Sequence, residues 1–596
     1  MPRVSPSNQL VVVLALLAVG AGFFVPGINW GLPSRRVDSF LFGQHSVWSG
    51  REILQLAGPD DPSPGRAADI SARPIERRDQ PVVLNATDQD RARIVRRYRL
   101  MSYQPDEFET FKSLAEMKPS RGGLDPRMYK YGGLWMYPVG AMLKLAGAAG
   151  LVRLDPDQAY YLDHPEAFGR FYVVARLYSV LWGLIGIVAV FVVVRRITGE
   201  VTAGAAGALC FMMMPVVVNA AHEAKPHLAG AVLMLLAVIA ASRFLEGGRR
   251  GEGILAAALC GAGVGMVPSV LPVVLVLPPM VIFSVAQPRA AVPQSTQPRG
   301  EVPHIVLGMG GALLVATLVY CITNPYVPIN LFRNPAVLRS NFANSAAFYR
   351  AEWTGAGVPH ALLLVGEGAS FVLATAGLGA MLALAARAVR RRHATPEQEK
   401  RRRATGLLLA VPSLAVAGQF ILFAAGQPAD YARFALPFDI FLAVEAVVAT
   451  ATFVRPRAGR AACYAVLVLT TAYMGSLYTR AFLRDASRRT TRIAAADRIQ
   501  NLLDAGNRVL ATRQEPAPWS LPPANLFRWR MILPPRTAGG GAISGADVTV
   551  GPAELPPGPQ PVGVKLPTST PVSWASKRFQ IEAGHRPGSA GLRSRR

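Results

Sequence analysis

The chain has 596 residues, of which 51% are hydrophobic and only 17% are charged, and its formal net charge is +26. Its mean hydropathy is +0.27, and apolar runs close to the roughly 20 residues that span a bilayer core recur along most of the sequence. These features exclude a soluble enzyme, a secreted disulfide scaffold and a disordered chain.

The sequence predicts an all-α polytopic membrane protein with about 11 transmembrane helices. The first apolar stretch is as long as a signal peptide, but no convincing small-residue cleavage site follows it, so we interpret it as a retained first helix. The predicted spans cover residues 10–25, 171–194, 203–219, 226–244, 253–267, 269–285, 304–322, 358–386, 405–425, 434–453 and 461–478.

The loops between these spans differ in charge, which predicts the orientation in the cell membrane. One alternating set is rich in basic residues, including Arg195 and Arg196 and the cluster at 387–403, whereas the opposite short loops hold few, such as Lys225 and Arg433. Cytoplasmic loops attract Lys and Arg. We therefore expect the N-terminus in the cytoplasm, and the long first loop and the C-terminal tail outside it. Because the basic residues report topology, they do not indicate nucleic-acid binding.

The spans divide the chain into five predicted regions. The apolar segment 131–150 would break the alternation of loops if it crossed, so we interpret it as a re-entrant or interfacial helix. A helix is also expected at 491–505, whereas Pro, Gly, Ser and Thr dominate from about 535 onward and predict little order. The regions are a first helix at 1–29, an extracytoplasmic loop at 30–170, a bundle of about 10 helices at 171–478, a small segment at 479–535 and a tail at 536–596.

Acidic residues gather in the first outer loop. Asp106 and Glu107 lie in the sequence Gln-Pro-Asp-Glu and precede apolar residues at helical spacing. Such residues are favoured at a helix start by capping and by the helix dipole; alternatively, one carboxylate faces an interfacial cavity as a general base. Asp38, just after the first span, is a second candidate base or a helix cap.

The other outer loops carry candidate substrate-binding residues. Four ionisable groups between two apolar helices are expensive unless they pair or line a wet cavity, although a solvated turn with an exposed Glu–Lys pair is the alternative. An arginine at the mouth of a helix holds a phosphate in bidentate fashion or extends to lipid headgroups. The candidates are His222, Glu223, Lys225 and His227 in the second outer loop, Asn324 and Tyr326 in the third, and Tyr431 and Arg433 in the fourth.

The order of these motifs resembles a known superfamily. One helix is followed by a long outer loop with Pro-Asp-Glu, by the segment Tyr129-Lys130-Tyr131-Gly-Gly-Leu, by a span starting near Arg176, by the loop Ala-His-Glu-Ala-Lys-Pro-His and by a late Ala-Arg-Phe-Ala-Leu-Pro. This order is similar to that of the polytopic glycosyltransferases of the lipid-linked-donor superfamily (GT-C fold), which includes protein O-mannosyltransferases and aminoarabinose lipid A transferases.

The resemblance implies an inverting transfer of a sugar from a polyprenyl-phosphate carrier to an acceptor at the outer face. It implies Asp106 as the general base, with Glu107 positioning it or sharing its proton. It also implies that Lys225 and Arg433 neutralise the leaving phosphate, with Tyr431 packed nearby. Two departures from the superfamily pattern stand out. His227 replaces an Asp that many relatives carry, and the first loop is long before Pro-Asp-Glu, which leaves Asp38 as a rival base.

The sequence leaves several alternatives open. A transporter or flippase has a similar helix count but places ionisable residues in broken helices at mid-membrane; Glu445 is the clearest acid within a span, and no internal repeat is evident. A non-catalytic scaffold is the third alternative.

For a glycosyltransferase, the sequence leaves open whether the acceptor is a protein, a lipid or a polysaccharide. Some relatives use a divalent cation, but no set of metal ligands or paired cysteines stands out here.

Overall fold

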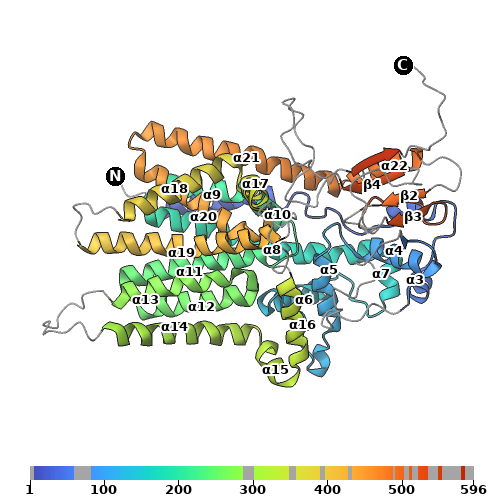
Figure 1. Ribbon diagram of the computed structural model, residues 1–596, viewed down its shortest axis with the longest axis horizontal. Helices are drawn as coiled ribbons and strands as arrows, with labels where there is room; N and C mark the ends of the chain where they lie inside the picture. The colour runs from blue at the N-terminus through green and yellow to red at the C-terminus, as the bar shows by residue number, and fades with distance from the viewer. Residues whose placement is uncertain are drawn as a thin grey trace, which may run out of the picture. The chain divides into compact units, whose positions relative to one another are not determined.

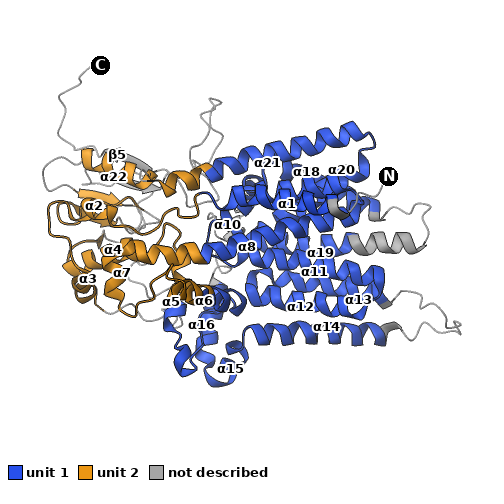
Figure 2. Cartoon of the chain, turned by 180° about the vertical axis from the view of Figure 1, so that it is seen from behind, with its two compact units in different colours: residues 1–26, 113–141, 175–479 blue, residues 27–112, 142–174, 480–596 orange. Residues whose placement is uncertain are grey.

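The computed structural model describes most of the chain as helix, and the described residues form two compact units (Figures 1 and 2). Unit 1 contains residues 1–26, 113–141 and 175–479, and unit 2 contains residues 27–112, 142–174 and 480–596. Within these ranges the described residues are 6–58, 82–285, 301–347, 357–389, 396–426, 432–487, 490–502, 509–512, 521–533, 548–552 and 579–583.

Unit 1 is a helical bundle. In Figure 1 the helices α11, α12, α13 and α14 run side by side, and α18 packs against α20. The elements that lie wholly in this unit are α1 (Pro6–Phe24), η3 (Pro119–Arg121), α9 (Val201–Met213), α10 (Pro215–Ala221), α11 (His227–Gly247), α12 (Arg250–Met266), η4 (Pro268–Val276), α13 (Leu277–Val285), α14 (Glu301–Thr323), α15 (Tyr326–Arg333), α16 (Pro335–Ala347), α17 (Gly357–Ala369), α18 (Phe371–Val389), α19 (Pro396–Gly426), η6 (Ala432–Phe434) and α20 (Leu436–Phe453). Four helices contribute to both units: α5 (Glu107–Glu116), α6 (Gly133–Ala148), α8 (Pro165–Thr198) and α21 (Arg457–Ala486).

Small residues let the helices of unit 1 pack closely. A Cβ on Gly261 of α12 would lie 2.1 Å from the carbonyl oxygen of Ala316 in α14, and one on Gly475 of α21 would lie 1.9 Å from the carbonyl oxygen of Met213 in α9. Neither position has room for a side chain. Membrane helices associate through such small-residue contacts, because lipid tails remove the hydrophobic driving force between them.

The described helices confirm a multi-pass helical membrane protein. Five of them are long and apolar enough to cross a membrane, and the total reaches seven if each of two bent pairs is one span. Shorter apolar helices, such as the one at Asn8–Phe24, fall below that length. The predicted number of about 11 spans therefore stays a prediction.

Two predicted spans are broken rather than straight. The span expected at 203–219 bends by 62° between α9 and α10, where Pro215 follows Met214. The span expected at 358–386 bends by 108° between α17 and α18. Ser370 lies at that second break with φ of +78°, a conformation that non-glycine residues seldom adopt. The segment expected to be re-entrant or interfacial forms α6.

Unit 2 combines short helices with a five-stranded sheet. Its elements are η1 (Arg35–Val37), α2 (Asp38–Phe42), α3 (Gly50–Ala57), α4 (Asp88–Leu100), α7 (Gln158–Asp163), α22 (Thr491–Leu502) and the strands β1 (Val82–Val83), β2 (Val509–Thr512), β3 (Arg530–Leu533), β4 (Val548–Pro552) and β5 (Phe579–Ala583). The strand order is β1-β3-β2-β4-β5, with β2 parallel to both β3 and β4. The helix expected at 491–505 is confirmed as α22 over Thr491–Leu502, and residues 503–505 lie outside the described residues.

The sheet differs from the sequence-based expectation of little order after about residue 535. Both β4 and β5 lie in that stretch, and they pair antiparallel with each other. Their segments are short and surrounded by Pro and Gly, so their composition predicts no strand. Pairing of β4 with β2, and of β5 with β4, supplies the backbone hydrogen bonds that the local sequence does not predict.

A buried ion pair holds the helices of unit 2. Arg99 of α4 is fully buried, and its Nε and Nη2 atoms donate to the two carboxylate oxygens of Asp38 in α2 at 3.2 and 3.0 Å. Its Nη1 atom donates to the carbonyl oxygens of Trp48, just before α3, and Leu162 of α7. One guanidinium thus contacts the chain around three other helices of the unit.

We expect Arg99→Met to lower the free energy of unfolding by about 3–5 kcal/mol, because the Asp38 carboxylate would stay buried without its cation. The double variant Asp38→Asn with Arg99→Met should recover most of this loss, since no charge remains buried. Denaturant unfolding of the purified protein in detergent measures both effects.

Arg91→Ala is the matched control, because it removes an exposed ion pair with Asp88 from the same helix. Its expected cost is at most about 1 kcal/mol. Equal losses for Arg99→Met and Arg91→Ala would contradict the role assigned to Arg99.

Candidate functional site

The two acidic candidates lie at the start of α5, within unit 2. Glu107 is its first residue and is fully buried, and its carboxylate accepts a hydrogen bond from the Ser102 hydroxyl at 2.5 Å. Asp106 directly precedes the helix and is only half-buried. Its backbone N–H donates to the side-chain oxygen of Gln104 at 3.3 Å. The two neighbouring carboxylates therefore have different environments: Glu107 is held inside the unit, and Asp106 is the more accessible.

The segment that leads to Asp106 is fixed by its neighbours in unit 2. The backbone N–H of Tyr103 donates to the carbonyl oxygen of Gly31 at 2.9 Å, and the N–H of Gly31 donates to the carbonyl oxygen of Asp485 at 3.2 Å. Gly31 has φ of +58°, and a Cβ there would lie 2.7 Å from Tyr103. Only glycine combines that backbone conformation with so close an approach.

The first turns of α5 are anchored by aromatic packing. Phe111 is buried, and its ring meets those of Phe168 and Tyr172 edge-on at 5.8 and 4.7 Å. The Tyr172 hydroxyl donates to the carbonyl oxygen of Leu100 at 2.8 Å and accepts from the backbone N–H of Ser102 at 3.3 Å. Asp106 thus follows a segment whose backbone is hydrogen-bonded to Tyr172 and to Gly31.

Asp38, the rival base, is committed to Arg99. It is 7% exposed, and both of its carboxylate oxygens accept hydrogen bonds from the guanidinium. Burial raises the pKa of Asp38, and the attraction of Arg99 opposes that rise. Proton transfer to this carboxylate would break the ion pair that holds α4, so the geometry favours a structural role.

The loop with His222, Glu223, Lys225 and His227 is a buried turn in unit 1, between α10 and α11. The alternative of a solvated turn with an exposed ion pair is wrong, because Glu223 is 3% and Lys225 is 2% exposed. Their side chains lie 3.5 Å apart. The Glu223 carboxylate also accepts from the Asn219 amide at 3.1 Å, and its carbonyl oxygen accepts from the Ser179 hydroxyl at 2.6 Å. The turn is thus buried because its polar groups are paired within the bundle.

His222 joins this turn to the end of α1. Its Nδ1 atom lies 2.8 Å from the carbonyl oxygen of Val218, and its Nε2 atom lies 2.9 Å from that of Pro26. The fully buried Arg176 of α8 is close enough to affect the charge of this imidazole. The order of the sequence motifs predicts Arg176 only as the start of a span, whereas a charged residue inside a long apolar helix is itself the signal of a candidate functional residue.

Three motifs of the sequence meet at His227. Its ring lies edge-on to Phe434, with the centroids 5.4 Å apart, and to Tyr131 at 6.2 Å. The Ser269 hydroxyl lies 3.4 Å from its Nδ1 atom. Arg433 precedes Phe434, and its guanidinium lies 5.1 Å from that ring. The structure therefore brings together the second loop, the late Arg-Phe motif and the Tyr129–Tyr131 segment, whereas Tyr431 lies outside the described residues.

Asn324 and Tyr326 have scaffold contacts. The side-chain oxygen of Asn324 accepts from the backbone N–H of Gly133 at 2.7 Å, and its amide nitrogen donates to the carbonyl oxygen of Gly265 at 3.2 Å. It therefore ties the start of α6 to the end of α12. The Tyr326 hydroxyl accepts from the backbone N–H of Leu124 at 3.2 Å. Both side chains thus hold the segment around the start of α6, and their expected role in substrate binding stays a prediction.

The candidates are thus divided between the units. Asp38, Asp106 and Glu107 belong to unit 2, and the remaining described candidates belong to unit 1. Across the described ranges, no group of three or more His, Cys, Asp or Glu side chains is arranged to hold a metal ion.

Comparisons with known proteins identify relatives of limited similarity. Residues 166–322 match the family of dolichyl-phosphate-mannose-protein mannosyltransferases, and no curated protein sequence matches the chain. The structure of ArnT from Cupriavidus metallidurans bound to undecaprenyl phosphate is 16% identical, with a TM-score of 0.43, and the match covers 72% of this chain and 83% of that chain. The oligosaccharyltransferase of Archaeoglobus fulgidus in the apo form is 13% identical, with a TM-score of 0.41, and the match covers 91% of this chain and 69% of that chain.

The family match contains the buried turn of unit 1. Residues 166–322 include Arg176, His222, Glu223, Lys225 and His227, which are among the charged and polar side chains that this turn and α8 place inside the bundle. Over this stretch the resemblance predicted from the sequence is confirmed: residues 166–322 are similar to the protein mannosyltransferases, one of the groups that the resemblance includes.

Proposed function

We propose that this chain is a membrane glycosyltransferase that moves a sugar from a polyprenyl-phosphate carrier to an acceptor at the outer face of the membrane. The observation that carries the proposal is the family match over residues 166–322, whose name specifies a lipid-phosphate sugar donor. The matched region includes the buried turn around Lys225. Ionisable residues inside a membrane bundle are costly and mark functional sites by default, which supports a role for this turn in binding the donor.

The proposed reaction is a single displacement at the anomeric carbon of the donor. The acceptor hydroxyl oxygen forms a bond to that carbon, while the bond from the carbon to the phosphate oxygen breaks. The polyprenyl phosphate leaves with the bonding electron pair, and the hydroxyl proton passes to the base. Attack from the side opposite the phosphate inverts the anomeric configuration.

Asp106 is the proposed general base. It lies at the accessible start of α5, whereas Glu107 is buried against the Ser102 hydroxyl. Glu107 is the proposed positioning residue, because its hydrogen bond holds the first turn of α5 and so the direction of the preceding carboxylate. A positioned base contributes roughly 10²–10⁴-fold to such a proton transfer.

Lys225 and Arg433 are proposed to stabilise the leaving phosphate. Both belong to unit 1, and Arg433 directly precedes the ring that packs on His227. Preorganised cations stabilise charge that develops on a leaving group without reorganisation during the reaction. His222, Glu223 and His227 would hold the turn that presents Lys225.

A specific feature favours the alternative of a transporter or flippase. Two apolar helix pairs are broken, at Met214 and at Ser370, and the fully buried Asp439 of α20 faces Gly368 next to the second break. Broken helices with buried acids are typical of transporter sites. Movement of a fluorescent polyprenyl phosphate across proteoliposome membranes without any sugar transfer would support this alternative.

We expect Asp106→Asn to reduce sugar transfer by roughly 10²–10⁴-fold, because an amide cannot accept the hydroxyl proton. Binding of the donor, followed as a thermal shift with polyprenyl-phosphate sugars, should stay unchanged. Transfer is measured in proteoliposomes against a panel of such donors. Glu109→Gln, on the same helix, is the matched control and should retain activity. Full activity of Asp106→Asn would move the base to Asp38 or defeat the mechanism.

We expect Lys225→Met to abolish most of the thermal shift caused by polyprenyl phosphate, with affinity reduced by about tenfold or more. Lys225→Arg should retain part of it, because the charge is kept. The double variant Glu223→Gln with Lys225→Met leaves no buried charge in the turn, so it tests binding if the single variant unfolds. Lys144→Met, at an exposed position of α6, is the control. An unchanged shift in the double variant would exclude Lys225 from donor binding.

A further inference from the structure

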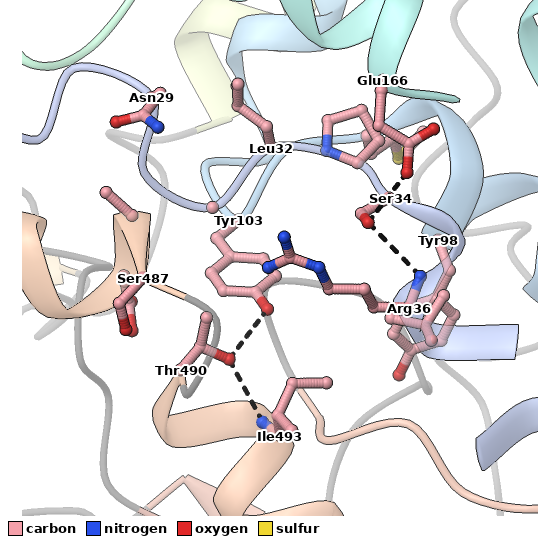
Figure 3. Close-up of a pocket in the computed structure, with 16 residues that line it drawn as sticks. Asn29, Leu32, Ser34, Arg36, Tyr98, Tyr103, Glu166, Ser487, Thr490 and Ile493 are labelled. Atoms are coloured by element: carbon pink, nitrogen blue, oxygen red, sulfur yellow. Dashed lines mark hydrogen bonds between the residues drawn. The ribbon is translucent and has the colours of Figure 1, made fainter. Parts of the chain in front are cut away.

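Unit 2 contains a cavity of about 240 Å³ that the proposed chemistry does not use (Figure 3). Its walls come from the chain that follows α1, from the end of α4 with the segment leading to Asp106, from the start of α8, and from the junction of α21 and α22. The volume lies below the roughly 300–1,000 Å³ of pockets that take drug-sized ligands. A ligand of this cavity is therefore small, of the size of one ring with its substituents.

The polar groups of the cavity have mixed charge. Arg36 is an exposed guanidinium, and Figure 3 shows it extending toward the ring of Tyr103. Glu166 lies on another wall, and its carboxylate accepts from the Ser34 hydroxyl and from the backbone N–H of Arg35, both at 2.9 Å. The Asn29 amide adds a donor and an acceptor.

The hydroxyl groups on the floor of the cavity are ordered. The hydroxyls of Tyr103 and Thr490 are hydrogen-bonded at 3.2 Å, and Thr490 also accepts from the backbone N–H of Ile493. Burial raises the pKa of Tyr103, so its phenol stays protonated. The carboxylate of Asp485, which also lines the cavity, lies 3.5 Å from the guanidinium of Arg492.

This combination selects a neutral ligand over an anion. A phosphate would meet Arg36 but also the carboxylate of Glu166, which repels it, while Asp485 is already paired with Arg492. A sugar hydroxyl both donates and accepts, so adjacent hydroxyls of one ring match a guanidinium, a carboxylate and an amide at the same time. The lining is thus complementary to a hydroxyl-rich ring without net charge.

We propose that this cavity binds one neutral saccharide unit of the acceptor, which makes the acceptor a glycan or a glycosylated molecule. The identification as acceptor rests on the proposed function. Met101 and Tyr103 line the cavity and lie in the same segment as Asp106, which follows Tyr103 by three residues. A bound ring therefore contacts the segment that carries the proposed base, and the Gly31 hydrogen bond to Tyr103 keeps that wall in place.

Saturation-transfer NMR on the full-length protein in detergent tests the proposal with free sugars. Mannose and arabinose are the neutral probes, and inorganic phosphate and a Ser-Thr dipeptide are the competing ones. We expect saturable binding of a neutral sugar, weakened about tenfold or more in Arg36→Gln through loss of a charge-assisted hydrogen bond. Arg35→Gln is the matched control, since the side chain of Arg35 does not line the cavity, and it should bind like the unchanged protein.

Asn29→Ala serves as a second variant, because Asn29 is exposed and its replacement does not threaten folding. It should weaken sugar binding less than Arg36→Gln does. The absence of saturable sugar binding would overturn the proposal, as would sugar binding that both variants leave unchanged. Binding of phosphate or of the dipeptide alone, sensitive to Arg36→Gln, would also overturn it, in favour of an anion or peptide site.

The experiment separates this proposal from the proposed function. Sugar binding needs neither the donor nor Asp106, so Asp106→Asn should bind the probe normally. Sugar binding without transfer from any polyprenyl-phosphate donor would leave the cavity as a saccharide site and refute the glycosyltransferase. Sugar transfer without sugar binding would support the proposed glycosyltransferase activity and refute the proposal that the cavity binds a saccharide.

Discussion

The buried guanidinium of Arg99 is the constraint on which unit 2 depends. A charge removed from water is tolerated only when its hydrogen-bonding capacity is met, and here Asp38 and two backbone carbonyl groups meet it. Because these partners come from segments far apart in the chain, the ion pair sets the position of α4 relative to α2 and α7. The end of α4 leads directly into residues 100–103 and then to Asp106. The direction of the candidate base, Asp106, therefore depends on this ion pair.

Unit 1 also buries charged side chains, in this case within a bundle of apolar helices. Its helices pack through small residues, and its charged turn at 222–227 is buried because its polar groups pair with neighbouring side chains and backbone carbonyls. Such pairing offsets the free-energy cost of burying the Lys225 ammonium group inside the bundle, and it also holds the side chain in place. A preorganised cation of this kind suits the proposed donor, a phosphodiester that carries one negative charge and gains a second as its bond to the sugar breaks.

The contacts also distinguish candidate site residues that the sequence alone presents as equivalent. Asp38, Asp106 and Glu107 all lie in the loop predicted after the first span, and nothing in their spacing distinguishes a base from a structural carboxylate. Their environments do: Asp38 is bound to Arg99, Glu107 to Ser102, and Asp106 is half-buried at a helix start. Asn324 and Tyr326 likewise resemble binding residues in sequence, but their hydrogen bonds join α6 to α12 and to the loop before it.

The sequence by itself determined the helical membrane character, the start of α5 at the Pro-Asp-Glu motif, the helix α22 and the resemblance to GT-C glycosyltransferases. These features depend on hydropathy, local capping and short motifs, which neighbouring residues carry. Only the tertiary structure decided that Glu223 and Lys225 are buried, that Asp38 pairs with Arg99, that two spans break at Met214 and Ser370, and that β2 pairs in parallel with β3 and β4. Each of these depends on partners distant in the chain, and burial or pairing between distant segments leaves no periodic signal in either segment alone.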